Sequence, residues 1–119
     1  MKKSKPVKQL RVVLFVDTKG ESRLWIAQCL EHDFAVQAET LRDAISAFKL
    51  GLWEQMLLDK HFGVEPLSCL GEAPDSYVKM FDEGVPLEKG IVESAPVGTA
   101  KELVESLLHD IRSVGRVFA

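Results

Sequence analysis

Short apolar runs separated by turn-forming residues open the chain. Residues 10–16 are rich in Val, Leu and Phe and end at the turn formers 17–20, and a second run covers residues 22–30. Two such runs joined by a short loop that contains glycine predict a β-hairpin. After a polar break, apolar and more polar positions alternate over residues 34–39, which indicates a third strand with one buried face. Together these runs predict an antiparallel meander of three strands.

A long helix is predicted from Thr40 to about His61. Thr40 and Asp43 nearly match a capping box, in which the threonine hydroxyl accepts a hydrogen bond from the backbone N–H of Asp43, and Gly63 is a stop signal. At about 100° per residue, one apolar stripe is expected to pack on the sheet: Leu41, Ala44, Ile45, Phe48, Leu52 and Met56. A helix with one core needs only one stripe. The helix nevertheless carries a second apolar group on nearly the opposite side, which needs its own partner: Leu50, Trp53 and Leu57.

Proline and glycine interrupt the chain repeatedly after this helix. Pro74 and Asp75 predict the start of a short helix that runs through Phe81. Residues 86–98 are rich in proline and glycine and are the best candidate for a hinge. Within this segment, residues 91–93 are predicted to form a short strand.

A further amphipathic helix is predicted near the end of the sequence. Residues 99–102 form a capping box, and Gly115 is a suitable terminator. Apolar residues follow the box at helical spacing: Leu103, Val104, Leu107, Leu108 and Ile111. The sequence therefore predicts an α+β domain over residues 8–84, a Pro/Gly-rich hinge over residues 85–98 and a C-terminal amphipathic helix over residues 99–115.

Length and composition fit a single domain. The chain has 119 residues, of which 46% are hydrophobic, and single domains usually have about 100–150 residues. The longest unbroken apolar run, residues 12–16, is far shorter than the ~20 residues that a membrane helix needs and too short for a signal peptide. We therefore expect a soluble, cytoplasmic protein in which Cys29 and Cys69 are reduced thiols.

The charge balance argues against a dedicated nucleic-acid-binding protein. The net charge is −3, whereas such proteins usually carry a basic domain or stripe. Only the first eleven residues are locally basic, and we interpret them as a solvated tail. Trp25 is an aromatic strand residue that could stack a base, but only Arg23 is a basic neighbour, so packing is the favoured role. A nucleic-acid-binding regulator that uses the basic N-terminus and the sheet face remains the main alternative.

Candidate catalytic and metal-binding residues are few. A nuclease of the RNase H type needs converging carboxylates, and the candidates Asp17, Asp43 and Glu54 are better explained by a turn, a helix start and a position away from the core stripe. A zinc site would require converging ligands, for which the candidates are Cys29, Glu31, His32, His61 and Cys69. No phosphate-binding glycine loop or nucleophile motif is present. We expect no catalytic residue, cofactor or metal, and a metal-dependent nuclease is a remote alternative.

The stretch 24–31 together with 40–44 resembles the HicB family of antitoxins. The residues that carry the likeness are Trp25, Ala27, Cys29, Glu31, Gln37, Thr40, Leu41, Asp43 and Ala44. Residues 8–60 match well and residues 70–84 loosely. The resemblance implies a partial RNase H-like fold without nuclease chemistry, binding and neutralisation of HicA, a small toxin that cleaves messenger RNA, and assembly as a dimer or tetramer.

This chain departs from the family pattern at two places. Residues 31–33 replace the common Pro and Gly of the loop between the second and third strands. Residues 85–119 do not resemble the DNA-binding modules that end the family's typical members, so autoregulation of a promoter is not expected.

The sequence thus predicts an α+β fold, with a three- or four-stranded antiparallel sheet in β-β-β-α order packed on one long helix, and an extra C-terminal helix. The predicted function is that of a HicB-like antitoxin, or of a solitary HicB-like binding module, which occludes a HicA-type toxin. Two roles are open for the second apolar group. Either the C-terminal helix covers it, within the same chain or in a neighbouring subunit, or the group contacts another subunit or the toxin directly. The predicted interface residues are Leu50, Trp53, Leu57, Leu103, Leu107 and Ile111.

Overall fold

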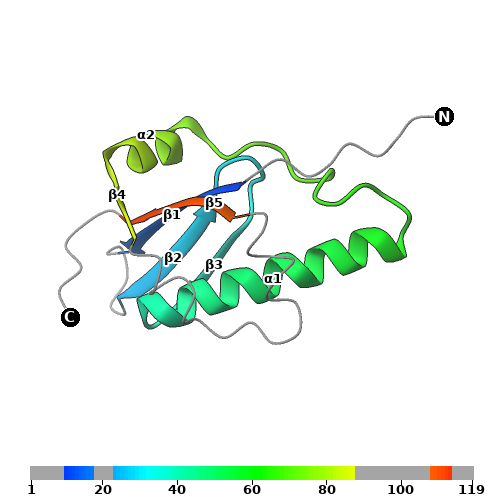
Figure 1. Cartoon of the computed structure of the whole chain (residues 1–119), viewed down its shortest axis with the longest axis horizontal. Helices are drawn as coiled ribbons and strands as arrows, with labels where there is room; N and C mark the ends of the chain where they lie inside the picture. The colour runs from blue at the N-terminus through cyan, green and yellow to red at the C-terminus, as the bar shows by residue number, and fades with distance from the viewer. Residues whose placement is uncertain (1–9, 18–22, 88–107, 114–119) are drawn as a thin grey trace.

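The computed structural model describes residues 10–17, 23–87 and 108–113 (Figure 1). The described part is an α+β fold that contains two helices and a five-stranded mixed sheet. In chain order its elements are β1 (Leu10–Asp17), β2 (Leu24–Cys29), β3 (Ala35–Ala38), α1 (Leu41–His61), α2 (Asp75–Glu83), β4 (Val85–Pro86) and β5 (Leu108–Ser113).

The predicted meander is present. β1 pairs antiparallel with β2, and β2 pairs antiparallel with β3. The prediction of a purely antiparallel sheet of three or four strands is wrong, because the strand order is β3-β2-β1-β5-β4 and β5 runs parallel to β1. A parallel pair needs a long connection between its strands, and no local turn signal in the sequence predicts the pairing of β1 with β5.

The predicted C-terminal helix is wrong for residues 108–113, which form β5. The register places Leu108 opposite Leu10 and Ile111 opposite Val12, and an irregularity between Leu10 and Arg11 absorbs the odd spacing. Pairing with β1 therefore overrides the spacing of apolar residues three apart, which is typical of a helix. Residues 88–107 lie outside the described residues, and with them lie the predicted strand at 91–93, most of the predicted hinge, Leu103 and Leu107.

The helices cover opposite faces of the sheet (Figure 1). α1 packs against the main core, to which β1 contributes Leu10, Val12 and Leu14. α2 packs against the other face, where Phe81 joins Val13 and Leu30 in a second core. Because successive side chains of a strand point to opposite faces, β1 supplies both cores. The main core consists of Leu10, Val12, Leu14, Ala27, Cys29, Ala44, Ile45, Phe48, Leu52, Leu67 and Ile111.

The predicted limits and packing face of the long helix are confirmed. The backbone N–H of Asp43 donates to the hydroxyl of Thr40 at 3.0 Å, which caps the first turn. Gly63 adopts a φ of 70°, a left-handed conformation suited to glycine beyond a helix end. The predicted core stripe is buried in, or packs against, the main core. The short helix predicted after Pro74 is also confirmed as α2.

Within the described ranges, neither helix combines the length and the apolar character that crossing a bilayer requires.

Candidate functional site

The C-terminal half of α1 carries an apolar surface that the described residues leave open. Leu50 and Leu57 are 48% and 47% exposed, whereas Trp53 between them is partly buried and packs against the main core. Leu50 and Leu57 of the second apolar group are therefore exposed, as predicted, whereas Trp53 of the same group packs against the main core instead of lying on the opposite side of the helix. Large apolar side chains gathered on one surface are typical of contact sites.

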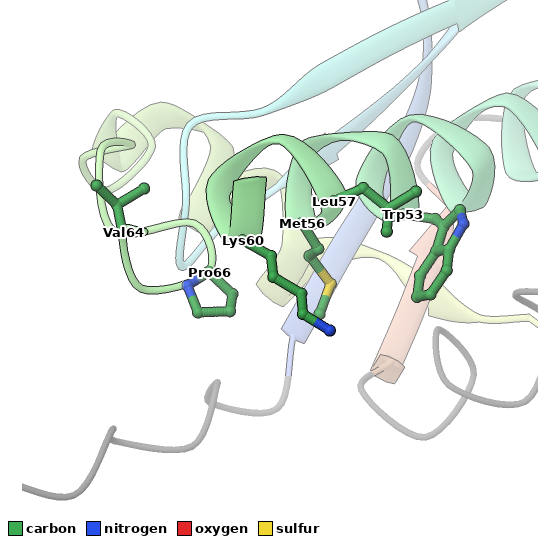
Figure 2. Close-up of a pocket in the computed structure, with 6 residues that line it drawn as sticks. All are labelled: Trp53, Met56, Leu57, Lys60, Val64 and Pro66. Atoms are coloured by element: carbon green, nitrogen blue, oxygen red, sulfur yellow. The ribbon is translucent and has the colours of Figure 1, made fainter. Parts of the chain in front are cut away.

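A pocket of about 250 Å³ lies beside this group, and we call it the α1 pocket (Figure 2). Its helical wall follows the i, i+3, i+4 spacing that places side chains on one face, and the loop after α1 supplies the opposite wall. Figure 2 shows the side chains of Trp53 and Met56 extending from the helix on the same side as Lys60. The lining residues are Trp53, Met56, Leu57, Lys60, Val64 and Pro66.

The α1 pocket combines a fixed floor with an exposed rim. Trp53 and Met56 both pack against the main core, so their positions are set by the fold. Leu57 and Val64 are 47% and 39% exposed. Lys60 is the charged residue of the lining and is exposed. This arrangement suits an apolar group of a partner that carries an acceptor or a negative charge at its edge.

Asp59 holds the loop that forms the second wall. Its carboxylate is buried, and Oδ2 accepts a hydrogen bond from the backbone N–H of Leu67 at 2.7 Å, while Oδ1 accepts one from Nε2 of Gln55 at 3.1 Å. The backbone carbonyl of Asp59 also accepts from the N–H of Val64 at 2.9 Å. Leu67 is fully buried and has a φ of 63°, a rare conformation for a residue with a branched side chain. The carboxylate therefore fixes the path of the loop past Val64 and Pro66.

Sequence reasoning missed Asp59 and a second buried charge on α1. Lys49 is fully buried, and it takes part in an interaction within the fold, as a buried ammonium must. A signal was present at Lys49, which lies on the helix between the core stripe and Trp53, where an apolar residue would be expected. Asp59 continues the line of the core stripe, three residues after Met56, so its place on the helix was also a signal of burial.

A second polar cluster lies on the face of the sheet that α2 covers. Glu31 accepts hydrogen bonds from the backbone N–H and from Nε of Arg11, each at 2.6 Å. The guanidinium groups of Arg11 and Arg112 lie 5.6 and 4.3 Å from the ring centre of Phe81, within the range of cation–π attraction. Arg11 belongs to the basic run at the start of the sequence, and its charge is here matched by Glu31.

The structure does not bring the candidate zinc ligands together. Cys29 is buried in the main core, whereas His61 and Cys69 are exposed on the far side of α1 and in the following loop. Among the described residues, no three His, Cys, Asp or Glu side chains are grouped to hold a metal ion. Burial raises the pKa of the Cys29 thiol to about 11. A hydrogen bond from the backbone of His32 lowers this pKa, and the negative charge of Glu31 raises it further. The thiolate that a metal ion would need is therefore harder to form at Cys29 than at an exposed cysteine.

The three carboxylates that were candidates for a nuclease site lie at separate positions in the fold. Asp17 ends β1, the backbone of Asp43 takes part in the cap of α1, and Glu54 is exposed on α1. Trp25, the possible stacking residue, packs against the main core as predicted.

Of the six predicted interface residues, three lie together on α1: Leu50, Trp53 and Leu57. Ile111 does not join them, since it is 9% exposed and lies in the main core on β5. Leu103 and Leu107 are outside the described ranges. The structure instead completes the surface with Met56, Lys60, Val64 and Pro66. The loop residues were missed because their position depends on the buried contact of Asp59, which no spacing reveals.

Comparison with known proteins adds no relative, since no family model, curated protein or solved structure matches this chain.

Proposed function

We propose that this protein is a binding module that acts by covering a surface of another protein, through the α1 pocket and the adjoining Leu50. More specifically, we propose a HicB-like antitoxin, or a solitary HicB-like module, whose partner is a HicA-type toxin that cleaves RNA. The observation that carries the proposal is an aromatic side chain, Trp53, held in place by the core beside exposed Leu57.

The energetics of such a surface favour a protein partner. Tryptophan is enriched among the residues that dominate binding energy at interfaces, above all where surrounding side chains exclude water. Completing the burial of an exposed leucine contributes on the order of 1–2 kcal/mol. Leu57 and Val64, both exposed, line the α1 pocket together with Trp53 and can help to exclude water from it when a partner binds.

Several residues that carry the HicB resemblance have roles that support the proposal. Ala27 and Cys29 are buried in the main core, and Thr40 caps α1. Glu31 binds Arg11 through both of its oxygens. The β-β-β-α order that the resemblance implies is also the order of β1, β2, β3 and α1. The likeness thus rests on positions that the fold uses.

The alternative of a nucleic-acid-binding regulator has less support. Arg11 is paired with Glu31, and the lining of the α1 pocket contains a single basic residue, Lys60. Electrostatic affinity for a phosphate backbone requires several free cations on one surface.

We also propose a cytoplasmic location and assembly into a dimer or tetramer.

The proposal is tested by co-purification of the tagged full chain from its native host, with mass spectrometry of the retained proteins. A small protein with ribonuclease activity, inhibited when this chain is added back, is the expected result. Leu57→Asp places a charge in the exposed apolar surface and is expected to abolish retention and inhibition. Leu58→Asp is the matched control, since Leu58 is the next residue, is 52% exposed and does not line the pocket.

Equal retention by the Leu57→Asp variant would contradict the role of the α1 pocket. Salt-sensitive binding of RNA by the purified chain, without a protein partner, would instead favour the nucleic-acid alternative.

A further inference from the structure

β3 forms one edge of the sheet, and it is short but carries neither charge nor proline, two features that often protect an edge. β3 comes first in the strand order, so one of its sides faces no strand among those described. Its sequence, Ala35–Ala38, contains no charged residue and no proline. At the opposite edge, β4 has two residues and one of them is Pro86. Natural sheets usually protect exposed edges with charge, proline or a bulge.

The register identifies which backbone groups of β3 point outwards. The N–H of Cys29 donates to the carbonyl of Phe34 at 2.9 Å, so these two residues occupy a hydrogen-bonded position of the ladder, with this one bond because the N–H of Phe34 donates to the carbonyl of His32. In an antiparallel ladder such pairs alternate with pairs that are not hydrogen-bonded. Val36 and Ala38 therefore bond to β2, while the N–H and C=O groups of Ala35 and Gln37 face away from it.

The outward groups remain available within the described part of the chain. No turn, loop or cap hydrogen bond there uses the backbone of Ala35 or Gln37. Both residues are exposed, whereas Val36 and Ala38 between and beside them are partly buried. β3 thus offers donors and acceptors at two alternate residues.

α1 holds this edge firmly from one face. A Cβ atom at Gly51 would lie 2.9 Å from the ring carbon Cζ of Phe34, so the helix backbone approaches the start of β3 closely. The Phe34 ring in turn lies 5.4 Å from that of Phe48 in the main core. A strand fixed in this way is a preorganised template for another strand.

We propose that the β3 edge pairs antiparallel with the β3 edge of a second copy of this chain, which makes one sheet continuous across both copies. Ala35 would lie opposite Gln37 of the second copy, and Val36 would lie opposite its own counterpart. This assigns the proposed oligomer to the β3 edge and leaves the α1 pocket to a different protein.

A second copy fits because the edge is self-complementary. In an antiparallel pair related by a two-fold axis, the outward N–H and C=O of Ala35 meet those of Gln37, and the reverse pair follows by symmetry. Side chains of the same face then lie opposite each other, with the apolar Val36 pair on the face that α1 covers. A register centred on Gln37 would form only one hydrogen-bonded pair within the strand, so the register centred on Val36 is favoured.

The test compares two variants of the full chain that differ only in the sign of the charge at position 37, by light scattering after size-exclusion chromatography. In the proposed register, Ala35→Lys with Gln37→Lys places like charges opposite each other, and the mass is expected to fall to half that of the unmodified chain. Ala35→Lys with Gln37→Glu places opposite charges there and is expected to keep the unmodified mass. Both side chains are exposed, and circular dichroism checks that each variant folds.

An independent readout is amide hydrogen exchange of the unmodified chain. Ala35 and Gln37 should be protected at high protein concentration and lose protection on dilution, while Val36, which bonds to β2, should stay protected at both. A monomeric unmodified chain, or a Lys/Lys variant of unchanged mass, would overturn the proposal. Loss of the dimer in both variants would overturn the register. Toxin inhibition by the Lys/Lys variant is expected to persist, so failure of either proposal is distinguishable from failure of the other.

Discussion

At the scale of single residues, buried polar side chains determine the shape of the candidate site. Asp59 connects the last turn of α1 to Leu67 in the following loop and thereby positions Val64 and Pro66. A buried carboxylate is tolerated where hydrogen bonds compensate for lost hydration. The α1 pocket thus depends on a residue that does not line it.

Replacing Asp59 by Ala is expected to lower the free energy of unfolding by about 1–3 kcal/mol, because it leaves the buried N–H of Leu67 without an acceptor. Urea unfolding measures this loss. Asp82→Ala is the control, since Asp82 is exposed on α2 and its removal should change stability by less than about 0.5 kcal/mol. A similar, small loss in both variants would show that Asp59 does not hold the loop.

At the scale of elements, the sequence predicts what depends on local spacing and misses what depends on distant pairing. β1, β2, β3 and α1 follow from alternation, helical periodicity and a threonine cap. Trp53 and Leu57 were found in the same way, as apolar residues that the core stripe does not use. Val64 and Pro66 were not found, because a loop has no periodicity. β5 was mistaken for a helix because Leu108 and Ile111 are three residues apart, and the irregular pairing with β1 that accommodates them is not a local property.

Thr40→Ala is expected to destabilise the protein by about 1 kcal/mol, because the N–H of Asp43 then loses its acceptor at the start of α1. Thermal or urea unfolding provides the measurement. Thr40→Ser keeps a hydroxyl in place and should retain most of the stability. If serine proved as harmful as alanine, the cap would not be the source of the effect.

At the scale of the whole molecule, β5 links the start of the described chain to its end. Ile111 lies opposite Val12 in a parallel pair, and its carbonyl accepts a hydrogen bond from the N–H of Leu87 at 3.1 Å. The strand therefore joins β1 to the segment that follows α2. Pairing over this sequence distance costs chain entropy, which burial of Ile111 in the main core offsets.

Ile111→Ala is expected to lower the free energy of unfolding by about 2–5 kcal/mol, and Ile111→Val by about 0.5–1.5 kcal/mol, as for other buried isoleucines. Denaturant unfolding of both variants distinguishes a core strand from a surface helix. On an exposed helix, alanine would be tolerated at least as well as valine, because it is the better helix former.

The place of β5 also sets an order of events during synthesis. β1 is among the first described segments to leave the ribosome, yet one of its two neighbours is encoded at residues 108–113. Until translation reaches that point, a strand rich in Val, Leu and Phe has an open side in a growing chain. A chain cut short before Leu108 would therefore lack this neighbour of β1 and is expected to aggregate more readily than the full chain.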